Sequence, residues 1–240
     1  MKKILFFMGL SLFGAVSSGT SNAAENKGLT LEDIAKIESV GSFQVSPDGQ
    51  WVAYTKSSKR EPYVDDDGPA WSELYVKPVG SDAKPFITGK VNIGSVRWSK
   101  DSKKIYYIAM RNDDTFAGVY SIPVDGGESQ KVVGTKNNIL SYSLNSTGDK
   151  LVFIAKEGAP DHKEQLVLKG FQAKVYEEDI KDVNAWVYPL NNDDAEPTKL
   201  DIDGSVISAK FSPVADQLLV QVSPTPLIDD IYMKKTLQVV

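Results

Sequence analysis

The sequence contains no cysteine and only one histidine, His162. The absence of cysteine excludes disulfides, thiolate metal sites, cysteine nucleophiles and lipid anchoring through an N-terminal cysteine. A Ser-His-Asp triad needs a histidine close to its nucleophile. His162 follows Asp161 in a polar stretch that has no nucleophile motif. We therefore predict that His162 is a solvated surface residue and not a catalytic base.

A surplus of basic residues is also absent. The chain has 27 lysines and arginines against 32 aspartates and glutamates, which gives a formal net charge of −5. Because nucleic-acid binding requires positive charge to neutralise phosphates, we expect no nucleic-acid partner. The acidic clusters at residues 65–67, 113–114, 191–194 and 229–230 do not have the D-x-D-x-D-G spacing and distal glutamate of a calcium loop. We predict solvated turns at these clusters, with no metal and no cofactor.

No hydrophobic run is long enough to span a bilayer. The longest, residues 4–16, has about 13 apolar residues, whereas a bilayer core roughly 30 Å thick needs about 20. Lys2 and Lys3 precede this run, and a small-residue stretch ending S-N-A-A follows it. This order is typical of a secretory signal. We predict a signal peptide at residues 1–23 and a mature chain, residues 24–240, that is exported to the periplasm or secreted and has no membrane segment.

A strand–turn–strand pattern does occur, first at residues 43–54 (F-Q-V-S-P-D-G-Q-W-V-A-Y). Pro47 fixes φ for the second position of a β-turn, Gly49 accepts a positive φ, and the flanks are β-branched or aromatic. Similar patterns recur at residues 96–107, 142–153 and 209–220. Aligned on Ser46, Ser99, Asn145 and Ser212, the repeats are 53, 46 and 67 residues apart. Hairpins repeated near this period are typical of propeller blades.

Each of the first three repeats continues with further strands. A hydrophobic strand, a proline, one more apolar residue and a turn of Gly, Asn or Asp follow at residues 72–80, 118–127 and 184–194. A short fourth strand comes next, at residues 85–88, 130–133 and 198–202. Four meandering strands per repeat predict an all-β propeller with blades at residues 41–90, 91–135, 138–203 and 204–240. A short helix over residues 30–40, capped by Thr30, precedes the first blade.

The fourth repeat shows two strands, and its last ten residues (I-Y-M-K-K-T-L-Q-V-V) provide a possible third. Three complete blades and part of a fourth would leave open strand edges. We therefore expect a propeller portion that is open and cut short, and that self-associates through those edges.

The third repeat is longer than the others because of residues 155–184. Connections longer than about 12–15 residues are uncommon unless they are functional or disordered. This one contains several apolar residues, so we expect it to be ordered.

The signal peptide, L-T-L-E-D-I-A-K-I-E-S-V (residues 29–40), F-Q-V-S-P-D-G-Q-W-V-A-Y and S-P-T-P-L-I-D-D-I-Y-M (residues 223–233) together resemble the opening of a secreted serine peptidase of the prolyl oligopeptidase family. The resemblance is to its dipeptidyl-peptidase and acylaminoacyl-peptidase branches and covers nearly the whole mature chain. It implies a propeller placed before an α/β-hydrolase domain that carries the catalytic residues. No G-x-S-x-G nucleophile elbow occurs here, so we predict that the hydrolase domain is absent and that this chain is inactive alone.

One segment resembles a substrate-binding element of that family. Residues 175–178, V-Y-E-E, are similar to the segment by which dipeptidyl-peptidase propellers present two glutamates to the free α-amine of a peptide. The resemblance implies that Glu177 and Glu178 bind the substrate ammonium. Two carboxylates on one ammonium form charge-assisted hydrogen bonds, which are stronger than neutral ones. The alternative is a solvated acidic segment at the start of a helix, where carboxylates are favourable anyway.

Three functions remain open from the sequence. The first is the propeller part of an exported peptidase that limits access to the active site and orients peptide substrates. The second is a stand-alone, TolB-like propeller that binds proteins in the periplasm. The third is a truncated product without a function of its own.

Overall fold

The computed structural model describes residues 28–61, 63–158, 161–173, 180–192 and 194–240. The chain divides into two compact units, Met1–Lys36 and Ile37–Val240. The described part of the first unit contains one helix, α1 (Leu31–Ala35). As predicted, Thr30 caps it: the Thr30 Oγ1 accepts from the Asp33 N–H at 3.1 Å, and the Asp33 carboxylate accepts from the Thr30 N–H at 3.0 Å. The helix is shorter than the predicted span of residues 30–40.

The predicted helix ends early because the chain has already joined the first hairpin by residue 39. The Ser39 N–H donates to the Ser57 Oγ at 2.7 Å, and the Ser57 N–H donates to the Ser39 carbonyl at 2.8 Å. Val40 then pairs with Lys56 in the sheet.

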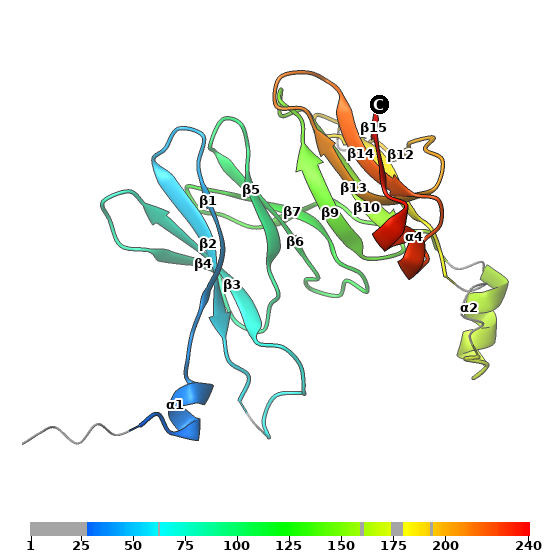
Figure 1. The fold of residues 1–240 in the computed structure, drawn as a ribbon. Coiled ribbons are helices and arrows are strands. Elements are labelled where there is room, and N and C mark those ends of the chain that lie inside the picture. Colours follow the sequence, from blue (N-terminus) through cyan, green and yellow to red (C-terminus); the bar gives the residue numbers. More distant parts are fainter. Residues whose placement is uncertain (1–27, 62, 159–160, 174–179, 193) are drawn as a thin grey trace, which may run out of the picture. The chain divides into compact units, whose positions relative to one another are not determined.

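Four antiparallel sheets follow one another along residues 37–240 (Figure 1). The first contains β1 (Val40–Val45), β2 (Trp51–Ser58), β3 (Trp71–Pro78) and β4 (Lys84–Ile87). The second contains β5 (Gly94–Trp98), β6 (Lys104–Ala109), β7 (Gly118–Pro123) and β8 (Gln130–Val133). The third contains β9 (Ile139–Leu144), β10 (Lys150–Lys156), β11 (Val183–Pro189) and β12 (Thr198–Lys199). The fourth contains β13 (Ser205–Phe211), β14 (Leu218–Ser223) and β15 (Thr236–Val239).

In every sheet the strands lie in sequence order, so each sheet is a meander. All four predicted hairpins are antiparallel, and the predicted all-β, blade-like architecture is confirmed. The third strand predicted within the last ten residues is present as β15, which pairs with β14, and a helix, α4 (Ile228–Met233), precedes it. The long connection of the third repeat contains a helix, α2 (Asp161–Leu168), which was not predicted.

The core consists of three apolar layers, one between each pair of successive sheets. Side chains alternate between the two faces of a strand, so one strand contributes every second residue to a layer. Tyr107, Leu74 and Phe153 are among the largest fully buried side chains. Phe153 stacks on Trp186 of the neighbouring strand with ring centres 5.5 Å apart. Burial of such residues provides the main favourable term for folding.

The first strands of successive sheets are also joined by hydrogen bonds. The Trp98 indole N–H donates to the Gln44 carbonyl at 3.0 Å and joins β5 to β1. The Tyr142 hydroxyl donates to the Ser95 carbonyl at 2.8 Å and joins β9 to β5. The Phe211 N–H donates to the Ser143 Oγ at 3.2 Å and joins β13 to β9. The four first strands therefore lie along one common edge of the stack.

Candidate functional site at the two ends of the sheets

Because the strands run antiparallel, each sheet has two ends of different character (Figure 1). We call the end formed by the connections between first and second strands the turn end; it comprises residues 46–50, 99–103, 145–149 and 212–217. We call the opposite end, where the second and third strands are connected, the loop end; it comprises residues 59–70, 110–117, 157–182 and 224–235. Among the described residues of the unit Ile37–Val240, the helices α2 and α4 are at the loop end.

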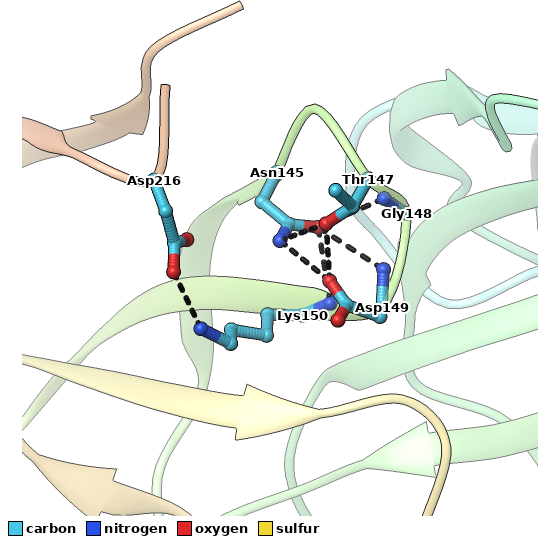
Figure 2. A network of polar contacts seen from close by, with 6 residues as sticks. All are labelled: Asn145, Thr147, Gly148, Asp149, Lys150 and Asp216. Atoms are coloured by element: carbon cyan, nitrogen blue, oxygen red, sulfur yellow. Dashed lines mark hydrogen bonds and ion pairs between the residues drawn. The ribbon is translucent and has the colours of Figure 1, made fainter. Parts of the chain in front are cut away.

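Asn145 organises the third turn, because the hydrogen-bonding groups of its side chain are bonded to residues of that turn (Figure 2). Its Oδ1 accepts from the N–H groups of Gly148, Asp149 and Lys150 at 3.0–3.1 Å. Its Nδ2 donates to the Thr147 Oγ1 and to the Asp149 carboxylate, both at 2.7 Å. The buried amide therefore has no capacity left for a ligand.

The first two turns use a serine and an aspartate in the same way. The Ser46 hydroxyl donates to the Asp48 carboxylate, which also accepts from the Gln50 N–H at 3.0 Å. The Ser99 hydroxyl donates to the Asp101 carboxylate at 2.6 Å, with the Lys103 N–H as second donor at 3.1 Å. These donors stabilise the charged form, so the serine hydroxyls and backbone N–H groups lower the pKa of both aspartates below the usual value.

Contacts between turns then close the turn end. The Asp48 N–H donates to the Ser102 Oγ at 3.1 Å, and the Lys150 Nζ lies 2.6 Å from the Asp216 carboxylate (Figure 2). Two hollows of about 550 and 340 Å³ lie between the turns and share Lys100 and Gly148 in their walls. The carboxylates of Asp101 and Asp149 and the amide of Asn145 in their walls are already bonded within the turns. We therefore interpret the turn end as a structural element whose polar groups stabilise the turns.

The loop end is held by interactions that reach across longer stretches of chain. In the first connection the Arg60 guanidinium lies 3.7 Å from the centre of the Trp71 ring and donates to the carbonyls of Pro69 and Asp66 at 2.7 and 2.8 Å. The Lys90 Nζ, from the segment after β4, lies 2.6 Å from the Asp65 carboxylate. The Arg60 contacts and the Asp65–Lys90 ion pair therefore help to order this loop.

The second connection contains a similar network around Asp114. Its carboxylate accepts from the Tyr120 hydroxyl and lies 2.7 Å from the Lys131 Nζ. Burial opposes ionisation of Asp114, but these two donors outweigh it and lower its pKa. Burial and the adjacent carboxylate raise the pKa of Tyr120 far above its usual value.

The fourth connection is closed by Asp230 of α4, which is buried. Its carboxylate accepts from the Thr225 hydroxyl and from the Lys234 ammonium, both at 2.7 Å. The hydrogen bonds from Lys234 and Thr225 lower the pKa of Asp230 below its usual value.

The third connection, residues 157–182, is the longest and contains α2. The helix ends in a Schellman motif: the Phe171 N–H donates to the Leu166 carbonyl at 3.0 Å and the Gly170 N–H to the Val167 carbonyl at 2.9 Å. Gly170 has φ +91°, a left-handed conformation that favours glycine. Leu166, Leu168 and Phe171 are exposed, so the end of α2 presents apolar side chains at the loop end.

The residues predicted to form the substrate site fall in this same connection. Glu177 and Glu178 lie outside the described residues, so their proposed role stays a prediction. His162 lies near the start of α2, and its side chain is likewise outside the described part of the chain. Sequence reasoning missed the helix itself, although the D-H-K-E-Q-L-V-L-K-G sequence contains a glycine at the position typical of a helix end.

The acidic clusters agree only partly with the prediction. Asp65, Asp114 and Asp230 are each within 2.7 Å of a lysine ammonium. Their neighbours Asp66, Asp67, Asp113 and Asp229 are exposed, as predicted. Among the described residues, no group of three or more histidine, aspartate or glutamate side chains is arranged to hold a metal ion. These carboxylates therefore order the loop end.

Comparison with known proteins relates this chain to peptidases. No family model matches the sequence. Over 142 residues the chain is 26% identical to dipeptidyl-peptidase 5 of Porphyromonas endodontalis, a match that covers 59% of this chain and 20% of that protein. The matched stretch thus spans about a fifth of the length of this relative. No helix in the part of the chain that the structure describes is long and apolar enough to cross a membrane.

Solved structures of peptidases have a similar fold. Acylaminoacyl peptidase of Pyrococcus horikoshii has a TM-score of 0.57 and 16% identity, over 79% of this chain and 29% of that one. The β-propeller domain of the trilobed protease of Pyrococcus furiosus has a TM-score of 0.51 and 16% identity, over 78% and 49% of the two chains. At these identities the structures establish the fold. Together with the sequence match, they confirm that this chain resembles the propeller portion of prolyl oligopeptidase-family peptidases.

Proposed function

We propose that this chain is the N-terminal propeller part of an exported serine peptidase, in which it limits access to the active site and orients peptide substrates. The single observation that carries the proposal is the sequence similarity to dipeptidyl-peptidase 5, combined with a propeller-type fold whose longest connection contains the V-Y-E-E segment. Binding residues are commonly located on loops that a rigid scaffold positions. The turn end and the apolar layers are such a scaffold.

The finer proposal concerns how the peptide is held. Glu177 and Glu178 bind the free α-amine of the substrate, so the position of the cleaved bond is fixed relative to the N-terminus of the peptide. Two observations support this assignment. The segment follows α2 and its Schellman motif closely in sequence, so a locally ordered element leads into it. Three carboxylates of the other connections, those of Asp65, Asp114 and Asp230, are already paired with lysines, which leaves them unsuited to bind a substrate ammonium.

The test uses the complete protein encoded by the gene. We expect Glu177→Gln and Glu178→Gln each to lower kcat/KM for dipeptide substrates with a free N-terminus by about 10- to 150-fold, because each loses a charge-assisted hydrogen bond. N-acylated dipeptides carry no ammonium and should be cleaved almost as before. Glu157→Gln is the matched control, because Glu157 is exposed in the same connection and has only Lys199 as an ion-pair partner, at 3.5 Å. Equal losses for both substrate classes, or none for either, would contradict the clamp.

Export is tested separately. We expect mass spectrometry of the protein recovered from its native cells to show an N-terminus at Ala24, because the signal would be cleaved after Ala23. A retained Met1 would contradict export through this signal.

A further inference from the structure

A cavity of about 380 Å³ lies between the first and second sheets. Its polar walls include Arg111, Asn112, Glu128 and Ser129, and Phe86 and Ile122 contribute apolar surface. This volume lies within the range of roughly 300–1,000 Å³ that is typical of sites for small molecules.

Arg111 is held in a fixed position in this cavity. Its Nη1 donates to the Tyr107 hydroxyl at 2.8 Å. Tyr107 is fully buried, and its hydroxyl also contacts the Ser129 hydroxyl. The guanidinium lies 5.9 Å from the centre of the Tyr120 ring. A guanidinium fixed in this way has already lost much of its rotamer freedom, which reduces the entropic cost of binding a ligand.

The charge of Arg111 has no anionic partner within ion-pair distance among the described residues. Its two contacts are a phenol hydroxyl and an aromatic ring, both neutral. Asp114, three residues away, is bonded to Tyr120 and Lys131 instead. A half-buried cation without a counter-ion is unfavourable, and a bound carboxylate would offset that cost through charge-assisted hydrogen bonds.

We propose that this cavity binds a small carboxylate with an apolar body, such as an apolar amino acid or the C-terminal residue of a short peptide. The carboxylate accepts from the Arg111 guanidinium, with Asn112 and Ser129 as neighbouring donors. The apolar body lies against Phe86 and Ile122. Glu128 repels a ligand whose only charge is the carboxylate. The site does not depend on the proposed peptidase function.

The experiment uses the ¹⁵N-labelled chain and follows the amide signals of Asn112, Gly127 and Ser129 during titration with N-acetyl-leucine. N-acetyl-leucinamide is the control ligand, since it has the same apolar body without the negative charge. We expect saturable shifts of these amides with the acid and at least about tenfold weaker binding of the amide, the size of one lost charge-assisted bond. Equal binding of acid and amide, or no shift of the three amides, would overturn the proposal.

Four variants locate the charge. Arg111→Gln should weaken binding of N-acetyl-leucine by about tenfold or more, and Arg111→Lys by less, since it keeps the charge without the planar fork. Glu128→Gln should strengthen binding, because it removes a like charge. Lys131→Gln is the matched control: it changes the Asp114 network in the same region without touching the cavity, and affinity should stay the same. Glu128 is exposed, so the Glu128→Gln variant should fold and remain informative even if the Arg111 variants fold poorly. If this variant binds N-acetyl-leucine with unchanged or lower affinity, the proposed site is contradicted.

Discussion

The turn end and the loop end are built from the same four sheets, yet they are stabilised by different interactions. At the turn end, short connections are closed by serine, asparagine and aspartate side chains that bond to N–H groups within a few residues. At the loop end, arginine and lysine side chains reach across the chain to carbonyls and carboxylates. The comparison teaches that the turn end serves as the scaffold. The connections of the loop end are longer and carry charged groups, which allows a distinct binding surface in each sheet.

The largest expected difference between the ends concerns Asn145. Asn145→Ala removes five side-chain hydrogen bonds and leaves three turn N–H groups without their acceptor, so we expect a loss of about 2–4 kcal/mol in the free energy of unfolding. The control is Asn137→Ala in the connection between β8 and β9, where the side chain makes one bond of 3.3 Å to the carbonyl of Lys156, the residue just before the third connection of the loop end. It should cost less than about 1 kcal/mol. Urea unfolding measures both, and equal losses would remove the distinction.

A smaller effect is expected from backbone conformation. Gly148 has φ +79°, and an added Cβ would lie 3.5 Å from the Cβ of Lys100, so the space is adequate and the strain comes from the backbone. We expect Gly148→Ala to cost about 1–2 kcal/mol. Gly158 has no positive φ, and an added Cβ there would meet the Asn137 Nδ2 at an ordinary 3.6 Å. Thermal unfolding should show little change for Gly158→Ala, and an equal cost at both glycines would be inconsistent with this account.

Arg60 provides the corresponding test at the loop end. Arg60→Ala removes the contact with Trp71 and two bonds to carbonyls, but these order only residues 59–70. We expect a loss below about 1 kcal/mol in global stability, because the site is at the surface. Cleavage of this loop by a protease should nevertheless become faster, since local opening is easier. A large global loss without faster cleavage would show that the loop belongs to the scaffold.

The smallest effect concerns acid titration. Asp48 and Asp230 both have a lowered pKa, the first mainly through the Ser46 hydroxyl and the second mainly through Lys234. A carboxyl with a lowered pKa in the folded state contributes stability above its unfolded pKa of about 3.9, and this is lost as pH falls through the folded pKa. Salt screens the attraction between the Asp230 carboxylate and the Lys234 ammonium more than it weakens the hydrogen bond from the neutral Ser46 hydroxyl to Asp48. NMR titration should therefore show that the pKa of Asp230 rises more than that of Asp48 in 1 M salt.

Much of the fold could be predicted from the sequence because its signals are local. The S-P-D-G turn, the period-2 strands and the prolines near strand ends act within a few residues, and the hairpins were predicted at their observed places. Ser102 shows the limit of such reasoning. It has φ +60° where two other turns have glycine, and its hydroxyl accepts from the Asp48 N–H of another sheet.

The loop end was predicted less well because its order depends on contacts between distant residues. The pair Asp65–Lys90 and the contact of Arg60 with Trp71 cannot be read from residue spacing. Helix α4 was missed for a similar reason, because Asp230 is satisfied by Thr225 and Lys234 only once the connection has folded. The cavity at Arg111 gave no sequence signal, since its walls come from both sheets.

The most direct test of the central claim, that the loop end is the peptide-binding end, is an amide shift map of the ¹⁵N-labelled chain. The probe is a short peptide with a free N-terminus and a C-terminal amide, so that it carries an ammonium and no carboxylate, with its N-acetylated form as control. We predict that the free peptide shifts amides of residues 157–182, that Glu177→Gln abolishes these shifts, and that amides of residues 46–50 and 145–149 stay unchanged. Shifts at the turn end, or equal shifts with the acetylated peptide, would contradict the account.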